Sequence, residues 1–117
     1  MPKNIAIFAS GSGSNAENII RYFTGSAELK FPVILSNKPD AFIHERAKNL
    51  NVPSLTFSKQ EFEAGDNILE VLKSYDIYAI VLAGFLLKVP VQIIRAYPHK
   101  IINIHPALLP KYGGKGM

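Results

Sequence analysis

The sequence predicts an α/β fold in one domain, a doubly wound parallel sheet with helices on both faces. Five short apolar runs alternate along the chain with segments whose apolar residues recur at helical spacing. The first of these runs, Ile5–Ala9, is continuous, which is typical of a central strand buried on both faces of a sheet. No repeat, linker or low-complexity segment interrupts this order, so we expect residues 1–117 to form a single domain.

The composition favours a globular protein without metal. Hydrophobic residues make up 48% of the 117 residues and charged residues 19%. The chain has no cysteine, which excludes disulfides and thiolate metal sites and suits a reducing cytosol. Its three histidines are scattered without the spacing of metal ligands, so we expect no metal site. No apolar run reaches membrane-spanning length, and we expect a soluble, cytoplasmic protein.

The charge pattern predicts a small anionic ligand rather than a macromolecular partner. The formal net charge is +4, but the basic residues are scattered and never form a block. Aromatic residues do not interleave with them as they do in proteins that stack on single strands. We therefore expect neither a nucleic acid nor a membrane as partner, and a phosphorylated or carboxylated small molecule as ligand.

The first apolar run, Ile5–Ala9, predicts a central strand that leads through a glycine loop into a helix over 16–23. Ser14, followed three residues later by Glu17, matches a capping box at the start of this helix. Backbone N–H groups of such a loop and the positive end of the helix dipole point at one spot, which makes an anion cradle. The candidate cradle comprises Gly11, Ser12, Gly13, Ser14 and Asn15.

The second unit pairs a strand with a helix. Phe31–Leu35 predicts the strand, and the polar segment Ser36–Pro39 its exit. Asp40 is then expected to cap a helix that ends near Asn49. The predicted apolar face of this helix consists of Phe42, Ile43, Ala47 and Leu50.

The third unit begins with a short strand, Ser54–Phe57. Ser58 and Glu61 form a second capping-box pattern, which predicts a helix running to about Ser74. Gly65 lies inside this helix and is expected to weaken it by about 1 kcal/mol. The side chains expected to face inward are Phe62, Ile68, Leu69, Leu72 and Tyr75.

Two further strands complete the pattern. Tyr78–Leu82 is strongly apolar and is followed by Gly84. Pro90 suits the first turn of a helix carrying Ile93, Ile94 and Tyr97, and Lys100–Asn103 predicts the fifth strand. If the strand order is 3-2-1-4-5, the exits of the first, fourth and fifth strands line one crevice where the order reverses.

Asn103 and His105 stand two residues apart at the exit of the fifth strand. In an extended segment, residues i and i+2 point to the same side, so an amide and an imidazole can address one small molecule. We interpret this pair as catalytic, and His44 and His99 as solvated side chains. The alternative for Asn103 is a residue that ends the strand by forming a turn.

The glycine loop also formally satisfies the dinucleotide fingerprint G-x-G-x-x-G/A. An NAD-binding protein would normally carry an acidic residue at the end of the second strand, where this chain has Ser36, Asn37 and Lys38. From the loop alone, a mononucleotide phosphate and a dinucleotide are about equally favoured as ligands. A third possibility is that the loop binds no ligand and only turns the chain. Together with the Asn/His pair, it favours a mononucleotide phosphate.

Four motifs resemble one enzyme family over the whole chain. They are Gly-Ser-Gly-Ser-Asn at 11–15, Ser-Asn-Lys-Pro-Asp-Ala at 36–41, Val-Leu-Ala-Gly-Phe at 81–85 and Asn-Ile-His-Pro-Ala-Leu-Leu-Pro-Lys-Tyr at 103–112. They resemble the phosphoribosylglycinamide formyltransferases, folate-dependent enzymes of purine biosynthesis. The last motif is the most specific of the four.

The resemblance implies transfer of a formyl group from 10-formyltetrahydrofolate, as cosubstrate, to the amine of glycinamide ribonucleotide. It implies catalytic roles for Asn103 and His105, with Asn103 also near the folate, and a substrate contact at Gly84. The glycine loop would hold the ribonucleotide phosphate. The segment implied to line the folate pocket contains Leu86, Leu87 and Val89. The expected partners are these small molecules alone, in a monomer or homodimer.

Two departures from the family pattern leave alternatives open. Leu87 stands where some members carry Arg. The family's third catalytic group, an Asp on a later loop, is absent up to Met117, so we expect the family domain to extend beyond the fifth strand. The alternatives are another folate-dependent formyltransferase, a 10-formyltetrahydrofolate hydrolase, or a non-catalytic nucleotide-binding module.

Overall fold

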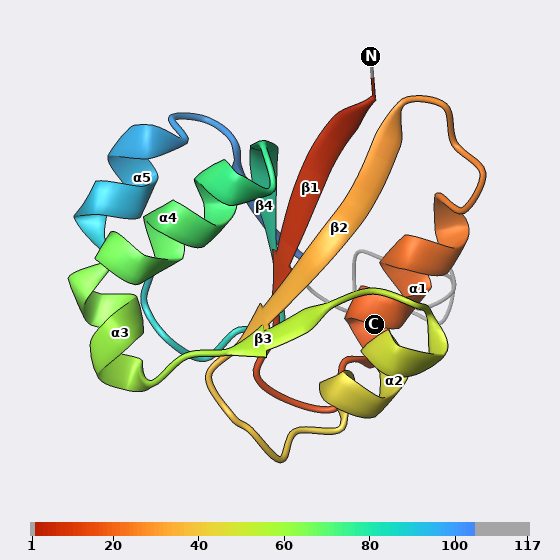
Figure 1. Cartoon of the computed structure of the whole chain (residues 1–117), viewed down its shortest axis with the longest axis horizontal. Helices are drawn as coiled ribbons and strands as arrows, with labels where there is room; N and C mark the ends of the chain where they lie inside the picture. Colours follow the sequence, from red (N-terminus) through yellow and green to blue (C-terminus); the bar gives the residue numbers. More distant parts are fainter. Residues whose placement is uncertain (1, 105–117) are drawn as a thin grey trace, which may run out of the picture.

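The computed structural model describes residues 2–104, which form a five-stranded parallel sheet (Figure 1). The strand order is β3-β2-β1-β4-β5, which confirms the predicted α/β fold and the predicted order. The order reverses between β1 and β4, the place where such sheets bind their ligands. The strands are β1 (Lys3–Phe8), β2 (Leu29–Ser36), β3 (Ser54–Thr56), β4 (Ile77–Ala83) and β5 (Ile101–Ile104).

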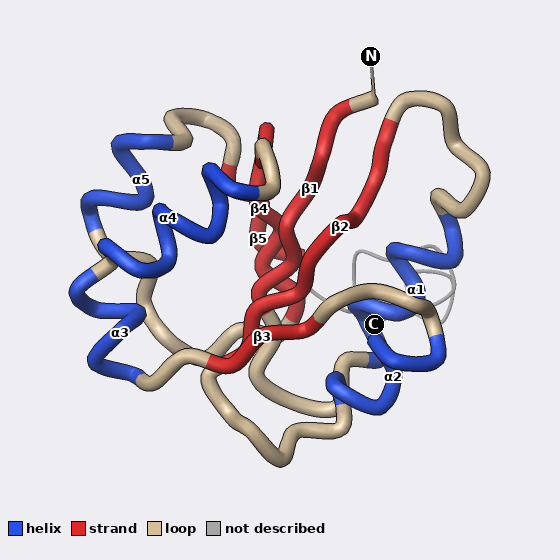
Figure 2. Tube along the Cα trace, viewed as in Figure 1, coloured by secondary structure: helices blue, strands red, loops and turns tan. Residues whose placement is uncertain are grey.

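Helices cover both faces of the sheet (Figure 2). One face carries α1 and α2, and the other carries α3, α4 and α5. The helices are α1 (Ser14–Tyr22), α2 (Ile43–Asn49), α3 (Lys59–Ala64), α4 (Asp66–Ser74) and α5 (Val91–Ala96). None of these helices is long and apolar enough to cross a membrane, a finding that covers residues 2–104.

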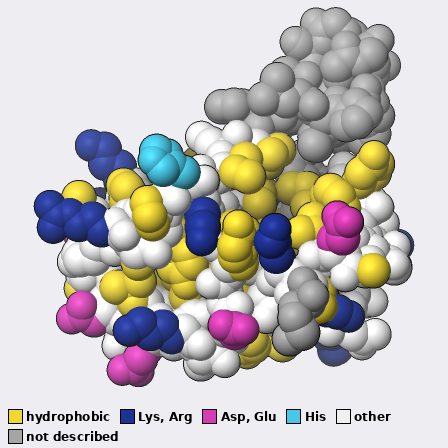
Figure 3. Space-filling model, turned by 90° about the horizontal axis from the view of Figure 1, so that it is seen from above, with side chains coloured by type: hydrophobic (Ala, Val, Ile, Leu, Met, Phe, Trp, Pro, Cys, Tyr) yellow, Lys and Arg dark blue, Asp and Glu magenta, His cyan; other side chains and the backbone are white. Residues whose placement is uncertain are grey.

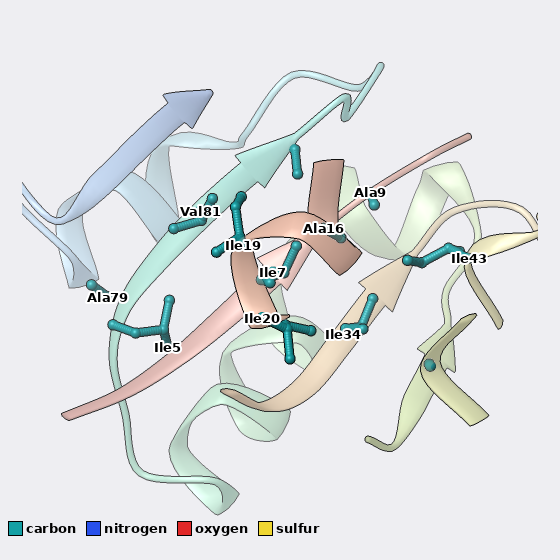
Figure 4. Packing of buried hydrophobic residues seen from close by; sticks show 12 residues of the cluster. Ile5, Ile7, Ala9, Ala16, Ile19, Ile20, Ile34, Ile43, Ala79 and Val81 are labelled. Atoms are coloured by element: carbon teal, nitrogen blue, oxygen red, sulfur yellow. The ribbon is translucent and has the colours of Figure 1, made fainter. Parts of the chain in front are cut away.

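Two hydrophobic cores lie on the two faces because successive residues of a strand point to opposite sides. In β1, Ile5 and Ile7 pack toward α1 and α2, whereas Ala6 and Phe8 pack toward the other three helices. Figure 4 shows the first of these cores, where Ile19 joins Ile5 and Ile7 against the central strands. The continuous apolar run of β1 thus feeds both cores at once.

The pairing register places the strand exits at one level. Phe8 pairs with Leu35 of β2 and with Leu82 of β4. Leu82 in turn pairs with Asn103 of β5. The carboxyl ends of four strands therefore lie at the same edge of the sheet.

The start of α1 differs from the predicted capping box. Gly13 is the N-cap, in a left-handed conformation with φ 80°, and no side chain caps the helix. Ser14 is already the first helical residue, so its hydroxyl is not in the capping position. The Glu17 carboxylate, which a capping box would turn back to the N-cap, binds Arg21 and Arg46 instead.

The start and the apolar face of α2 also differ from prediction. The helix begins at Ile43 with Phe42 as its N-cap, so Asp40 does not cap it. Backbone turns take that role, since the Ala41 N–H donates to the Lys38 carbonyl at 3.3 Å. Phe42 is 55% exposed and is not part of the core. The other predicted members do face inward, with Ile43 and Ala47 buried and Leu50 partly buried.

The long helix predicted after β3 is two helices, because Gly65 breaks it. Gly65 has φ 85° and is at once the C-cap of α3 and the N-cap of α4. The capping box of Ser58 and Glu61 at the start of α3 is confirmed in both of its hydrogen bonds. The side chains predicted to face inward do pack into the core, with Phe62, Ile68 and Leu72 buried and Leu69 and Tyr75 partly buried.

Helix α5 is shorter than its sequence pattern suggested. Pro90 is the N-cap, and the helix ends at Ala96. Of the three apolar residues named for this helix, Ile93 and Tyr97 are buried, whereas Ile94 is 47% exposed. Burial is the first cause that raises the pKa of the Tyr97 hydroxyl, followed by the charge of Asp76.

Candidate functional site

The glycine loop and the exit of β4 meet directly, as the predicted strand order requires. Ala9 and Ser10 follow the end of β1. The Ser10 N–H donates to the Gly84 carbonyl at 3.3 Å. On its other side, the Ala9 N–H donates to the Leu35 carbonyl of β2 at 2.9 Å. The chain therefore enters the glycine loop from a position held between the two neighbouring strands.

Gly13 is required by its backbone and by its neighbour. Its φ of 80° lies in the left-handed region, which strains residues with a side chain. A Cβ at this position would lie 2.2 Å from the Cδ1 atom and 2.9 Å from the Cα atom of Ile43. The loop is thus packed against the start of α2, and this need for glycine exists with or without a ligand.

Gly11 occupies the opposite situation. It is exposed, and a Cβ built on it meets no atom of residues 2–104 within 4 Å. Ser12 is also exposed, while Ser14 and Asn15 are partly exposed on the first turn of α1. The first N–H groups of a helix have no acceptor within it, so this turn offers donors to a bound anion. The open side of the predicted cradle is the Gly11 side.

Arg46 of α2 holds the glycine loop and is a residue that the sequence analysis missed. Its Nε atom donates to the Ser12 carbonyl at 2.7 Å, and its Nη1 atom donates to Glu17 Oε1 at 2.6 Å. The hydrogen bonds from Arg46, and next those from Arg21, hold the pKa of the Glu17 carboxyl below its ordinary value. Arg46 is 34 residues from Ser12, so no local pattern could have indicated this contact.

The exit of β4 turns sharply at Gly84. Gly84 has φ 72° and is exposed, and no atom of the described residues 2–104 lies within 4 Å of a built Cβ. The next residue, Phe85, returns to the core, where its ring lies 5.3 Å from Phe8 and 5.0 Å from Phe62 between centroids. This anchor fixes where the following segment leaves the sheet.

The three residues predicted to line a folate pocket do not share one environment. Leu86 is 71% exposed. Leu87 and Val89 are partly buried and pack against the core under α3, α4 and α5. Val89 also lines a hollow of about 640 Å³ together with Tyr97, Ile101 and others. Of the three, Leu86 is the most accessible to a ligand.

Asn103 lies in β5, with an exposed side chain. The strand continues to Ile104, so Asn103 does not end it by forming a turn. Ile101 packs against the same core as Leu87 and Val89, and by the two-residue period of a strand Asn103 shares this side of the sheet. His105 lies outside the described residues, and its pairing with Asn103 stays a prediction.

His44 is not a solvated side chain, contrary to the sequence analysis. Its Nε2 atom lies 3.0 Å from the Lys38 carbonyl and 3.0 Å from Thr56 Oγ1, and its Nδ1 atom lies 2.7 Å from Ser54 Oγ. A carbonyl only accepts, so Nε2 carries the proton in the neutral ring and Nδ1 accepts from Ser54. His44 therefore joins α2 to β3, and His99 is exposed.

The opposite end of the sheet, where the strands begin, carries a second hollow of about 530 Å³. Basic, acidic and hydrophobic side chains are interspersed over this end (Figure 3). Lys3 and Lys100 place their Nζ atoms 4.9 Å and 4.2 Å from the centre of the Tyr78 ring. Within residues 2–104, no three His, Asp or Glu side chains gather as a metal site would require.

The chain is similar in sequence to known formyl transferases. The model of the formyl transferase family matches residues 3–117. The chain is 38% identical over 121 residues to a chloroplastic phosphoribosylglycinamide formyltransferase of Arabidopsis thaliana, covering 98% of this chain and 41% of that protein. It is 38% identical to the phosphoribosylglycinamide formyltransferase of Haemophilus influenzae, covering 96% of this chain and 55% of that protein.

The fold of the chain is also similar to solved structures of proteins with related names. Glycinamide ribonucleotide transformylase 1 from Geobacillus kaustophilus superposes with a TM-score of 0.83 at 36% identity, covering 94% of this chain and 61% of that one. The fold described above is thus similar to the matching part of that structure. The chain spans about half the length of the relatives that it matches.

Proposed function

The chain belongs to the formyl transferase family, and from this premise we propose that its protein transfers a formyl group to glycinamide ribonucleotide. The donor in this proposal is 10-formyltetrahydrofolate, and the reaction serves purine biosynthesis. The observation that carries the proposal is the meeting of three exits, the glycine loop, Gly84 and Asn103, at one edge of the sheet. Relatives with 38% identity carry the name of this activity.

The glycine loop is proposed to hold the ribonucleotide phosphate. Backbone N–H groups at the start of α1 supply donors and the positive end of the helix dipole. Support comes from the exposed position of Gly11 and from the Arg46 hydrogen bond to the Ser12 carbonyl, which fixes the backbone of the loop. A hydrolase acting on the folate alone has no phosphate to bind, so this loop favours a transferase with a phosphorylated acceptor.

Asn103 and His105 are proposed to act on the formyl group. Attack by the substrate amine forms a tetrahedral intermediate whose oxygen becomes negative, and an amide N–H with a protonated imidazole can stabilise that charge. The amine must also lose a proton to a base within hydrogen-bond reach. By resemblance to the family, an Asp would take part in that step. The intermediate would then collapse by breaking the bond between the formyl carbon and the folate nitrogen, which takes up a proton and leaves as tetrahydrofolate.

The folate is proposed to contact the segment after Gly84. Exposed Leu86 lies beside Gly84, and Asn103 shares its side of the sheet with the neighbouring Leu87 and Val89. An apolar surface next to the polar pair of Asn103 and His105 suits the flat ring system of the folate, whose formyl group must reach the Asn103 amide. The cosubstrate would then meet the ribonucleotide amine between β4 and β5.

Acceptor specificity is the direct test. The protein that carries this chain should transfer formyl to glycinamide ribonucleotide about 100-fold faster than to water or to simple amines, because the site recognises a phosphate. Release of formate at the same rate without the ribonucleotide would contradict the transferase proposal and favour the hydrolase.

The catalytic histidine can be tested separately. We predict that His105→Ala lowers kcat by about 10²- to 10⁴-fold while the affinity for glycinamide ribonucleotide changes less than about threefold. The matched control is His99→Asn, which removes an exposed imidazole at a residue with φ 59° that Asn tolerates. Weakened ribonucleotide binding with unchanged kcat would contradict the catalytic role.

We also propose a cytoplasmic location and a monomer or homodimer. The absence of cysteine suits a reducing compartment. Cell fractionation and light scattering of the purified protein would test these two points.

A further inference from the structure

The motif after β2 has no part in the proposed reaction, yet it reaches the centre of the site. Asn37 directly follows β2, and its Oδ1 atom accepts a hydrogen bond of 2.6 Å from the Ser10 hydroxyl. Ser10 is only 1% exposed and lies between β1 and the glycine loop. Because Asn37 is 27 residues from Ser10, this hydrogen bond is a tertiary contact and not a local cap of a turn or helix.

The same hydroxyl binds the segment after β4. The Leu86 N–H donates to Ser10 Oγ at 2.9 Å, and the Ser10 N–H donates to the Gly84 carbonyl at 3.3 Å. A backbone N–H can only donate, so the hydroxyl accepts from Leu86 and its own proton points to Asn37. This also fixes the orientation of the Asn37 amide, whose oxygen must face Ser10.

Ser10 therefore connects the exits of β1, β2 and β4 at one buried oxygen. Gly11, the next residue, opens the loop proposed for the phosphate. Leu86 is the first residue of the segment proposed to contact the folate. It is 71% exposed, and its backbone N–H is fixed by the hydrogen bond to Ser10 Oγ. The chain from Leu86 N–H through Ser10 to Asn37 thus spans the boundary between the two proposed subsites.

We propose that Ser10 and Asn37 are positioning residues that set the distance between the phosphate loop and the folate segment. This proposal rests on the proposed function, because it assigns the two subsites to two substrates that must react with each other. Ser10 and Asn37 act through the backbone of Leu86 and Gly84, not on the reacting atoms. A displacement of about 1 Å between reactants can cost about 100-fold in rate while each substrate still binds.

The kinetic test uses the protein that carries this chain. Ser10→Ala and Asn37→Ala are expected to lower kcat by about 10- to 100-fold, with the Kd of glycinamide ribonucleotide within about threefold of wild type. Asn37→Asp, whose carboxylate still accepts from the hydroxyl, is expected to retain most of the activity. The double variant should lose no more than Ser10→Ala alone, since both residues act through one hydroxyl.

Ser36→Ala is the matched control. It removes another fully buried hydroxyl, at the end of β2 next to Asn37, whose hydrogen bonds within residues 2–104 are both to the Lys38 backbone. We expect its kcat to stay within about threefold of wild type. A loss of activity as large as that of Ser10→Ala, or equal losses in kcat and ribonucleotide affinity, would mean general support of the strand exits and would overturn the proposal.

Hydrogen exchange separates this proposal from the proposed function. The Leu86 amide should exchange slowly in the wild type and at least about 10-fold faster in Ser10→Ala and Asn37→Ala, but not in Ser36→Ala. Unchanged exchange at Leu86 in Ser10→Ala would overturn the proposal whatever the kinetics. A wild type without formyl transfer but with this exchange pattern would refute the function and leave the connection between the strand exits intact.

Discussion

Gly11 and Gly13 stand two residues apart in one loop and serve different ends. A Cβ built on Gly13 would lie 2.2 Å from Ile43, whereas one built on Gly11 has no atom of the described part of the chain within 4 Å. The first glycine keeps the face of the loop open, and the second lets α1 and α2 come together. A motif that looks uniform in the sequence therefore combines one glycine that packing requires with one that is proposed to serve the ligand.

The two glycines should respond oppositely to alanine. We predict that Gly13→Ala lowers the free energy of unfolding by about 2–4 kcal/mol, from overpacking against Ile43 and a strained φ. Gly11→Ala should change it by less than about 0.5 kcal/mol but weaken phosphate binding, because its methyl group enters the open face of the loop. Urea unfolding and phosphate titration would check both. Normal phosphate binding by Gly11→Ala would contradict the placement of the anion.

At the scale of elements, α1 and α2 are joined by a charge network rather than by a cap. The Glu17 carboxylate of α1 forms ion pairs with Arg46 Nη1 of α2 and with Arg21 Nε of its own helix, each at an N–O distance of 2.6 Å. Arg46 also reaches the Ser12 carbonyl. The position of the glycine loop thus depends on the packing of two helices that follow different strands.

This network gives a pH-dependent contribution to stability. The pKa of Glu17 is lowered in the folded protein, chiefly by Arg46, so the unfolded chain binds more protons at acidic pH. The contribution is present above the ordinary Glu pKa of about 4.3 and is lost as the pH falls through the folded value.

We predict that Glu17→Gln lowers the free energy of unfolding by about 0.5–1.5 kcal/mol at pH 7, and that this difference from wild type shrinks below about pH 4. The exposed Glu63 of α3 provides the control as Glu63→Gln, which should differ little from wild type. Chemical unfolding at pH 7 and at acidic pH measures the difference. An effect of Glu17→Gln that grew on acidification would contradict the assigned sign.

Gly65 distinguishes one long helix from two. Within a continuous helix, Gly65→Ala would raise stability by about 1 kcal/mol through helix propensity. In the structure Gly65 has φ 85°, and its built Cβ meets Gln92 only at ordinary contact distance, 3.5 Å. We therefore predict a loss of about 1–2 kcal/mol from backbone strain alone. A stabilised Gly65→Ala variant in urea unfolding would show that α3 and α4 are one helix.

At the scale of the molecule, the sheet separates two cores that share β1. The core under α3, α4 and α5 contains an aromatic cluster in which Phe62 lies 5.6 Å from Phe8 and 5.0 Å from Phe85. Phe8 belongs to the central strand, and Phe85 anchors the segment after Gly84. Stability of this core and the position of the proposed folate segment are therefore linked.

We predict that Phe62→Leu lowers the free energy of unfolding by about 1–3 kcal/mol, through lost aromatic contacts and a cavity. Phe42→Leu is the control, since Phe42 is 55% exposed and should cost less than about 0.5 kcal/mol. Thermal or urea unfolding would compare the two. Equal costs would contradict the assignment of Phe62 to the core.

Much of this molecule could be predicted from local patterns. Each of the five strands lies where the sequence predicted one. The pattern is clearest for β1, β2 and β4, because the central part of each is buried and therefore apolar. The capping box at Ser58 and Glu61 was found in the same way, since its two partners are three residues apart. The glycine loop was located because its neighbours in the sequence are also its neighbours in space.

Local patterns failed where the partner of a residue is distant in the sequence. Glu17 resembled half of a capping box, but Arg46 binds it across 29 residues. Phe42 and Ile94 fitted an apolar helical face, yet they are exposed, because burial also depends on what packs against the helix. His105 is outside the described residues, so its role stays a prediction.

By itself, then, the sequence determined the α/β class, the five strands, the loop at the start of α1 and the family motifs, because these depend on neighbours along the chain. Tertiary structure alone decided why Gly13 must be glycine, that Arg46 holds Ser12, and that Ser10 joins Asn37 to Leu86. The physical reason is that side-chain contacts between strand exits arise only after the sheet has brought distant segments to one edge.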